Sequence, residues 1–144
     1  MSDHGICAVE HLNHVCIAVR DIEDTLQFYQ DTFDVGAQEV EEVPDQGVRA
    51  VLMSVGGSQL ELIQPTDPAG SVARFIEHRG EGMHHICFEV DNLPEKLNSL
   101  GAAGVELIDK KPRRGVSGMI AFLHPHSTRG VLIELVDRET TPRR

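Results

Sequence analysis

The sequence of 144 residues has few of the features that mark exported, membrane-bound or nucleic-acid-binding proteins. No apolar run approaches the roughly 20 residues that a membrane-spanning helix needs, and the first residues lack the basic and apolar stretches of a signal peptide. Basic residues are scarce as well: 13 stand against 23 acidic ones, and the net charge of -10 opposes attraction to nucleic acid or anionic lipid. We therefore expect a cytoplasmic protein without nucleic-acid or membrane partners.

Cysteine is also rare, and its spacing excludes two further classes. Cys7, Cys16 and Cys87 are an odd number and form no C-x-x-C pair, which argues against a disulfide framework and a structural zinc site. The chain has the length of one ordinary domain, and its hydrophobic share of 40% is enough for a core. We expect a single domain over residues 1–144.

The main positive feature is an internal repeat. His14–Val19 (HVCIAV) is similar to His85–Val90 (HICFEV), and Gln59–Ile63 (QLELI) is similar to Leu132–Val136 (LIELV) at nearly the same spacing. Such self-similarity indicates a duplicated structural module. We place the modules at about residues 10–65 and 82–137, joined by a linker helix over about residues 68–79.

Each module has the same predicted order of elements, βαβββ, so the fold class is α+β. In both modules an alternating β-branched strand precedes a helix with apolar residues at helical spacing, and further strands follow it. Asp21 is the expected N-cap of the first helix, which ends at Phe33. The expected strands cover residues 14–19, 48–55 and 58–63 in the first module, and residues 84–90, near 105–108, 118–123 and 130–136 in the second.

The repeat places four residues with ligand chemistry at equivalent positions. His14 and His85 begin the first strand of each module, and Glu61 and Glu134 lie at the centre of the last. A single histidine of this kind usually only makes a hydrogen bond, and a single strand glutamate usually faces solvent. Two carboxylates among apolar residues, in register with two histidines, instead favour a shared divalent cation such as Co²⁺, Mn²⁺, Ni²⁺, Fe²⁺ or Zn²⁺.

These residues also carry a family resemblance, which covers roughly residues 10–137. The chain resembles the vicinal oxygen chelate (glyoxalase/bleomycin resistance) superfamily and, within it, the methylmalonyl-CoA epimerases. The segments that carry the resemblance are His11–Val15, Gln59–Pro65, Gly80–Ile86, Phe122–Pro125 and Gly130–Leu135. The resemblance implies paired βαβββ modules that form a half-open barrel, a homodimer, an acyl-CoA substrate and Co²⁺ as the first choice of metal. The implied metal ligands are His14, Glu61, His85 and Glu134.

The implied reaction interconverts the 2R and 2S forms of methylmalonyl-CoA through an enolate. A glutamate ligand can remove the C2 proton, with Glu134 the first choice and Glu61 the second. The chain departs from the family pattern at the second proton carrier. Some epimerases have a further glutamate after a Gln-Gly-Val turn, which is proposed to serve as the second acid/base. In this chain the turn is Gln46–Val48 and the matching position is Ala50. Glu61 and a metal-bound water remain the alternatives for this role.

Other functions remain open at this stage. A glyoxalase I-type lactoylglutathione lyase, another metal-dependent enzyme of the superfamily, also uses four ligands. An extradiol dioxygenase would need a three-ligand iron site, which the fourth ligand Glu61 disfavours. A non-catalytic small-molecule binding protein of the same fold is a further alternative, although such proteins generally lack the full set of four ligands. The basic run 110–114 (KKPRR) is either a contact for coenzyme A or a solvated loop.

Overall fold

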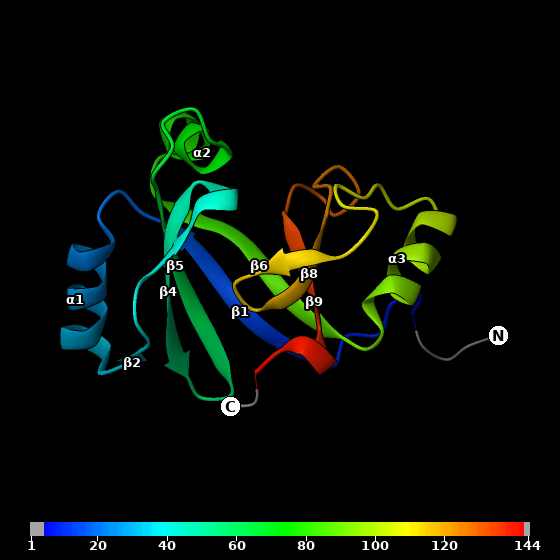
Figure 1. The fold of residues 1–144 in the computed structure, drawn as a ribbon, viewed down its shortest axis with the longest axis horizontal. Helices are drawn as coiled ribbons and strands as arrows, with labels where there is room; N and C mark the ends of the chain where they lie inside the picture. Colours follow the sequence, from blue (N-terminus) through cyan, green and yellow to red (C-terminus); the bar gives the residue numbers. More distant parts are fainter. Residues whose placement is uncertain (1–4, 143–144) are drawn as a thin grey trace. The chain divides into compact units, whose positions relative to one another are not determined.

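The computed structural model describes residues 5–142 and confirms an α+β chain in which the order βαβββ occurs twice (Figure 1). In both modules the first of the three later strands is interrupted. The elements, in chain order, are β1 (His11–Ala18), α1 (Ile22–Phe33), β2 (Gly36–Ala37), β3 (Glu41–Val43), the 3-10 turn η1 (Pro44–Gln46), β4 (Val48–Val55), β5 (Ser58–Pro65), α2 (Ser71–Arg79), β6 (Gly82–Val90), α3 (Leu93–Ala102), β7 (Arg113–Gly115), β8 (Gly118–Leu123), β9 (Ile133–Asp137) and the 3-10 turn η2 (Arg138–Thr140).

The chain forms two compact units, and the first contains residues 14–84. Its strands lie in the order β2-β4-β5-β1, with β3 beside β4. β1 and β5 run parallel, with Cys16 opposite Glu61, whereas β4 and β5 run antiparallel, with Leu52 opposite Glu61. The linker helix α2 belongs to this unit.

The second unit contains residues 85–142 and the segment 5–13 that precedes His14. Its strands lie in the order β6-β9-β8-β7. Cys87 lies opposite Glu134 in the parallel β6–β9 pair, and Phe122 lies opposite Glu134 in the antiparallel β8–β9 pair. The register around Glu134 therefore repeats the register around Glu61, which confirms that the two modules are structurally equivalent.

Two strand predictions in the second module were inaccurate. The segment near 105–108 forms only one isolated bridge, from Leu107 to Leu123, and the strand predicted from residue 130 begins at Ile133. β7, which pairs antiparallel with β8, was not predicted from the sequence. Pro112 explains part of this difference, because it has no N–H to donate to a sheet ladder just before the short strand.

The strands of each unit have one face covered by a helix and one face that carries histidine. We call the first the helix face and the second the histidine face. On the helix faces, α1 packs against β4 and β5 and α3 packs against β9 (Figure 1). Leu62 is buried with Ile22 on one helix face, and Leu135 is buried with Leu97 on the other. The glutamates next to these leucines, at positions 61 and 134, therefore point to the histidine faces.

Local chemistry determines where α1 begins and ends. Asp21 is extended and its carboxylate accepts a hydrogen bond from the Asp24 N–H at 3.0 Å, which confirms the predicted N-cap. Asp34 adopts a left-handed conformation at the other end, and its N–H donates to Gln30 O. Among residues 5–142, no helix combines the length and the apolar character that crossing a membrane requires.

Removing the α1 cap provides a test of these local contacts. Asp21→Ala is expected to lower the free energy of unfolding by about 1 kcal/mol, because the Asp24 N–H loses its carboxylate acceptor. Urea denaturation followed by circular dichroism measures the change. Asp31→Ala is the matched control: it removes the same charge from the same helix but only an i,i+4 bond to Gln27, and it should cost about 0.2–0.5 kcal/mol. Equal losses in both variants would contradict the capping role.

Candidate metal and proton-transfer site

The first module buries one histidine and one glutamate as a pair. His14 comes from β1 and Glu61 from the adjacent β5, and alternation along the two strands directs both side chains to the histidine face. His14 Nε2 lies 3.4 Å from Glu61 Oε1, and both side chains are almost fully buried. Because burying a carboxylate is costly without a partner, this arrangement needs a proton or a cation to balance it.

The second module repeats this pair with the same atoms. His85 Nε2 lies 3.1 Å from Glu134 Oε1, and both side chains are again almost fully buried. β9 lies between β6 and β8, so Glu134 has sheet neighbours on both sides, as Glu61 has between β1 and β4. The structure thus places the four predicted ligand residues in two equivalent pairs, one in each unit.

A cysteine accompanies each pair, and the sequence analysis did not identify it as part of the site. Cys16 lies opposite Glu61, and Cys87 lies opposite Glu134 with its sulfur within 4.8 Å of a Glu134 oxygen. Both cysteines are fully buried. The signal was present in the sequence, because the repeat is His-x-Cys in both modules rather than histidine alone.

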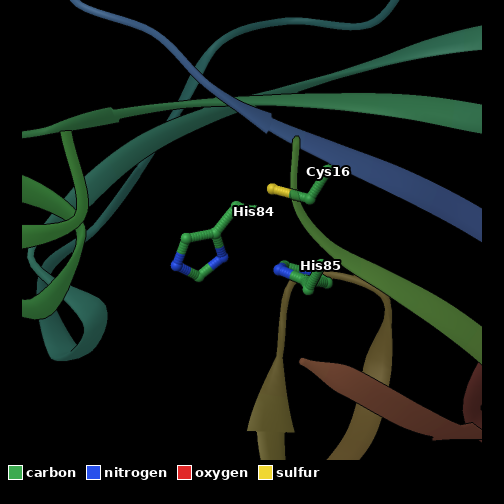
Figure 2. Close-up of side chains that lie close together, drawn as sticks. All are labelled: Cys16, His84 and His85. Carbon is green, nitrogen blue, oxygen red and sulfur yellow. The ribbon is translucent and has the colours of Figure 1, made fainter. Parts of the chain in front are cut away.

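His84 is a second residue whose position was not anticipated. Its place beside His85 predicts that it points to the other face of the strand. A ring nitrogen of His84 lies within 4.8 Å of Cys16 Sγ, and Figure 2 shows these two side chains close together. The His84 ring also makes an edge contact with Phe75 of α2, with 4.9 Å between ring centroids.

An aromatic ring and a charged cluster support the second pair. The ring of Phe122 meets the His85 ring edge-on, with 5.3 Å between centroids. The Phe122 N–H donates to Asp109 Oδ2 at 2.8 Å, and Arg113 Nε donates to Asp109 Oδ1 at 3.0 Å. The Arg113 guanidinium lies 5.5 Å from the centre of the Phe122 ring. Asp109 therefore fixes both the backbone of Phe122 and the Arg113 side chain that packs against the Phe122 ring.

The helix face of β4 carries a separate ion pair. The Arg49 guanidinium binds the Glu23 carboxylate of α1 and lies 3.5 Å from Glu42. The hydrogen bond from Arg49 holds the pKa of Glu23 below its ordinary value. The Arg49 guanidinium is thus already paired with carboxylates on the helix face.

The donors of the two pairs fit a divalent first-row cation. Each pair offers an imidazole nitrogen and a carboxylate oxygen, which are the ligand types that Co²⁺, Mn²⁺, Ni²⁺, Fe²⁺ and Zn²⁺ accept. Strands on both sides hold the glutamates in place, and an aromatic ring restricts His85. Such rigid and dry surroundings are typical of functional metal ligands.

Comparison with other proteins gives consistent relatives. The family model of the glyoxalase/bleomycin resistance protein/dioxygenase superfamily matches residues 13–122. The uncharacterized protein YqjC of Bacillus subtilis is 38% identical, over 90% of this chain and 93% of its own length. The ethylmalonyl-CoA/methylmalonyl-CoA epimerase of Cereibacter sphaeroides is 35% identical, over 88% of this chain and 97% of its own length.

Solved structures agree with these relatives. The methylmalonyl-CoA epimerase of Mycobacterium tuberculosis superposes with a TM-score of 0.87 at 34% identity, covering 93% of this chain and 90% of that one. A Streptomyces coelicolor methylmalonyl-CoA epimerase variant in complex with 2-nitronate-propionyl-CoA also gives 0.87, at 30% identity over 94% of this chain and 100% of its own. The chain therefore belongs to the glyoxalase/bleomycin resistance protein/dioxygenase superfamily and, within it, to the methylmalonyl-CoA epimerase family.

Proposed function

We propose that this chain interconverts the 2R and 2S forms of methylmalonyl-CoA by removing and returning the C2 proton. The observation that carries the proposal is the duplicated, buried His–Glu pair, whose four residues are those that the family resemblance implies as metal ligands. C2 of this substrate lies between a thioester carbonyl and a carboxylate, so its proton is acidic enough for a carboxylate base to remove.

We also propose that His14, Glu61, His85 and Glu134 hold one divalent cation, with Co²⁺ the first choice. Internal symmetry supports this, because each pair supplies one nitrogen and one oxygen ligand, and four such ligands leave positions open for a substrate. When bound, the cation would stabilise the negative charge that develops on the thioester oxygen. In this proposal the two modules act as one domain.

The protein side chains would carry the proton. Glu134 is the proposed base on one face of C2, since its carboxylate is buried and held against His85. Glu61 is the proposed carrier on the opposite face. Ala50 provides no carboxylate, while Glu61 is the buried carboxylate on the histidine face of β5. Low exposure of both groups limits their exchange with solvent.

The setting of the enzyme is part of the same proposal. The partner is an acyl-CoA, as the structures of relatives with bound acyl-CoA compounds suggest. We propose a homodimer by analogy with the family. Among residues 5–142, Cys7, Cys16 and Cys87 form no disulfide, which agrees with a reducing, cytoplasmic location.

The test uses one epimer of methylmalonyl-CoA in deuterated buffer, with Co²⁺ and then with excess chelator. Proton NMR follows loss of the C2 proton, and chiral analysis follows formation of the other epimer. We expect exchange together with inversion when Co²⁺ is present, and loss of both with chelator, because enolate formation would lose its charge stabilisation.

Two other outcomes are informative. No exchange with stoichiometric Co²⁺ bound would contradict the epimerase assignment, and turnover of a methylglyoxal–glutathione adduct would then be measured next. Exchange without inversion would contradict only the role of Glu61, because one base would work while no acid served the opposite face.

A further inference from the structure

Two adjacent arginines in β7 have opposite orientations, and only one of them lies on the histidine face. Arg113 is opposite Ile120, which is buried with Cys87 and Val136, whereas Arg114 is opposite Met119 on the other face. Strands β6, β9, β8 and β7 all lie in the described part of the chain, and these are their only lysines or arginines. Arg113 is therefore the one such cation that these strands place on the face of His85 and Glu134.

The position of Arg113 is held by two contacts. Its Nε donates to Asp109 and its guanidinium lies over Phe122, the ring that contacts His85. Within residues 5–142 the Nη nitrogens make no hydrogen bond, and the side chain is 43% exposed. The planar fork of an arginine held in this way is prepared for an oxyanion, which two parallel N–H groups bind.

The charge balance of the chain makes such a cation necessary. A net charge of -10 repels a polyanionic ligand, so binding an acyl-CoA calls for a local positive group on the protein. Arg49 of the first module does not supply it, because its guanidinium binds Glu23 and Glu42 on the helix face. Arg113 lies instead one aromatic ring away from His85.

We propose that Arg113 binds an oxyanion of the acyl-CoA substrate, either the malonyl carboxylate or a coenzyme A phosphate. The proposal rests on the proposed function for the identity of the ligand. Within the basic run 110–114, the two arginines therefore have different roles: Arg113 binds the ligand and Arg114 is a solvated side chain.

Isothermal titration calorimetry tests this with Arg113→Gln and Arg114→Gln, which remove the same charge from adjacent positions. We expect Arg113→Gln to weaken methylmalonyl-CoA binding by about tenfold to a hundredfold, the loss typical of a charge-assisted hydrogen bond. Arg114→Gln should change the affinity less than about threefold, since it has only surface electrostatics to lose. Equal affinities in the two variants would overturn the proposal.

Two further ligands separate the sources of the oxyanion. Propionyl-CoA has the phosphates but no malonyl carboxylate, and methylmalonyl-pantetheine has the carboxylate but lacks the nucleotide phosphates. An equal loss with propionyl-CoA assigns Arg113 to a phosphate. A loss that persists with methylmalonyl-pantetheine and is absent with propionyl-CoA assigns it to the carboxylate.

Structural damage is detected separately. Arg113→Gln should keep the thermal midpoint and the Co²⁺ affinity of the parent protein, and Arg113→Lys should recover part of the acyl-CoA affinity. A loss of Co²⁺ affinity with unchanged acyl-CoA affinity would overturn the proposal, since Arg113 would then act only by holding Phe122 against His85. Parent protein that binds acyl-CoA through Arg113 without epimerising it would reject the proposed function alone.

Discussion

Replacing Glu134 with glutamine is expected to lower the rate of epimerisation by about a hundredfold to ten-thousandfold, the range that a positioned base contributes. The amide has nearly the size of the carboxylate, so the sheet around β9 should keep its packing. It cannot accept a proton at catalytic pH, however, and it removes a negative charge beside His85. C2 exchange and inversion should therefore fall together.

The measurement is the initial rate of deuterium incorporation at C2 with saturating Co²⁺, together with a Co²⁺ titration. Glu89→Gln is the matched control, because Glu89 is a buried carboxylate on the same face of β6 and accepts a hydrogen bond from Asn13, which a glutamine oxygen can also accept. We expect this control to retain most of the activity. Glu134→Gln protein that binds Co²⁺ and exchanges at the parent rate would exclude Glu134 as the base.

Replacing Glu61 with glutamine is expected to separate exchange from inversion. The amide oxygen remains a metal donor, so Co²⁺ should still bind, and Glu134 should still exchange the C2 proton of the epimer that it faces. Inversion should fall by about a hundredfold to ten-thousandfold, because the opposite face of C2 loses its proton carrier. Chiral analysis of the acyl-CoA, in parallel with NMR of the same sample, gives both rates.

Glu41→Gln is the control for this second variant. Glu41 lies opposite Ala50 in the β3–β4 register, so its exposed carboxylate is on the histidine face. Ala50 is the position at which some epimerases have a further glutamate, and Glu41 lies on the neighbouring strand. We expect it to keep both exchange and inversion. If Glu41→Gln loses inversion while Glu61→Gln keeps it, the opposite-face carrier is Glu41, and the assignment of Glu61 is wrong.

Periodicity and the repeat predicted those parts of the fold that strong local signals determine. β4 was predicted with its observed bounds, and α1 was predicted between Asp21 and Phe33 because a cap and an apolar stripe define it. The repeat also paired His14 with His85 and Glu61 with Glu134, and the register confirms that these positions are equivalent. Two copies of one pattern identify a face that neither copy identifies alone.

The features that sequence missed depend on contacts from elsewhere in the fold. β2, β3 and β7 have two or three residues each, and they form only because β4 and β8 offer them a paired edge. Arg113 could not be distinguished from its basic neighbours, because the register with β8 decides which arginine faces Phe122. His84 likewise lies near Cys16, which alternation along the strand alone does not predict.

The segment before His14 has a consequence for the order in which the protein can fold during synthesis. Glu10 N–H donates to Glu89 O, and the Asn13 amide donates to the Glu89 carboxylate across 76 residues, so a segment that is made before residues 14–84 completes a unit whose other residues are made after them. The unit of residues 14–84 is continuous and can form early from local contacts. The other unit, residues 5–13 and 85–142, must close a loop over that whole module, so we expect it to fold more slowly. The segment 5–13 therefore remains unpaired until residues 85–142 have been made.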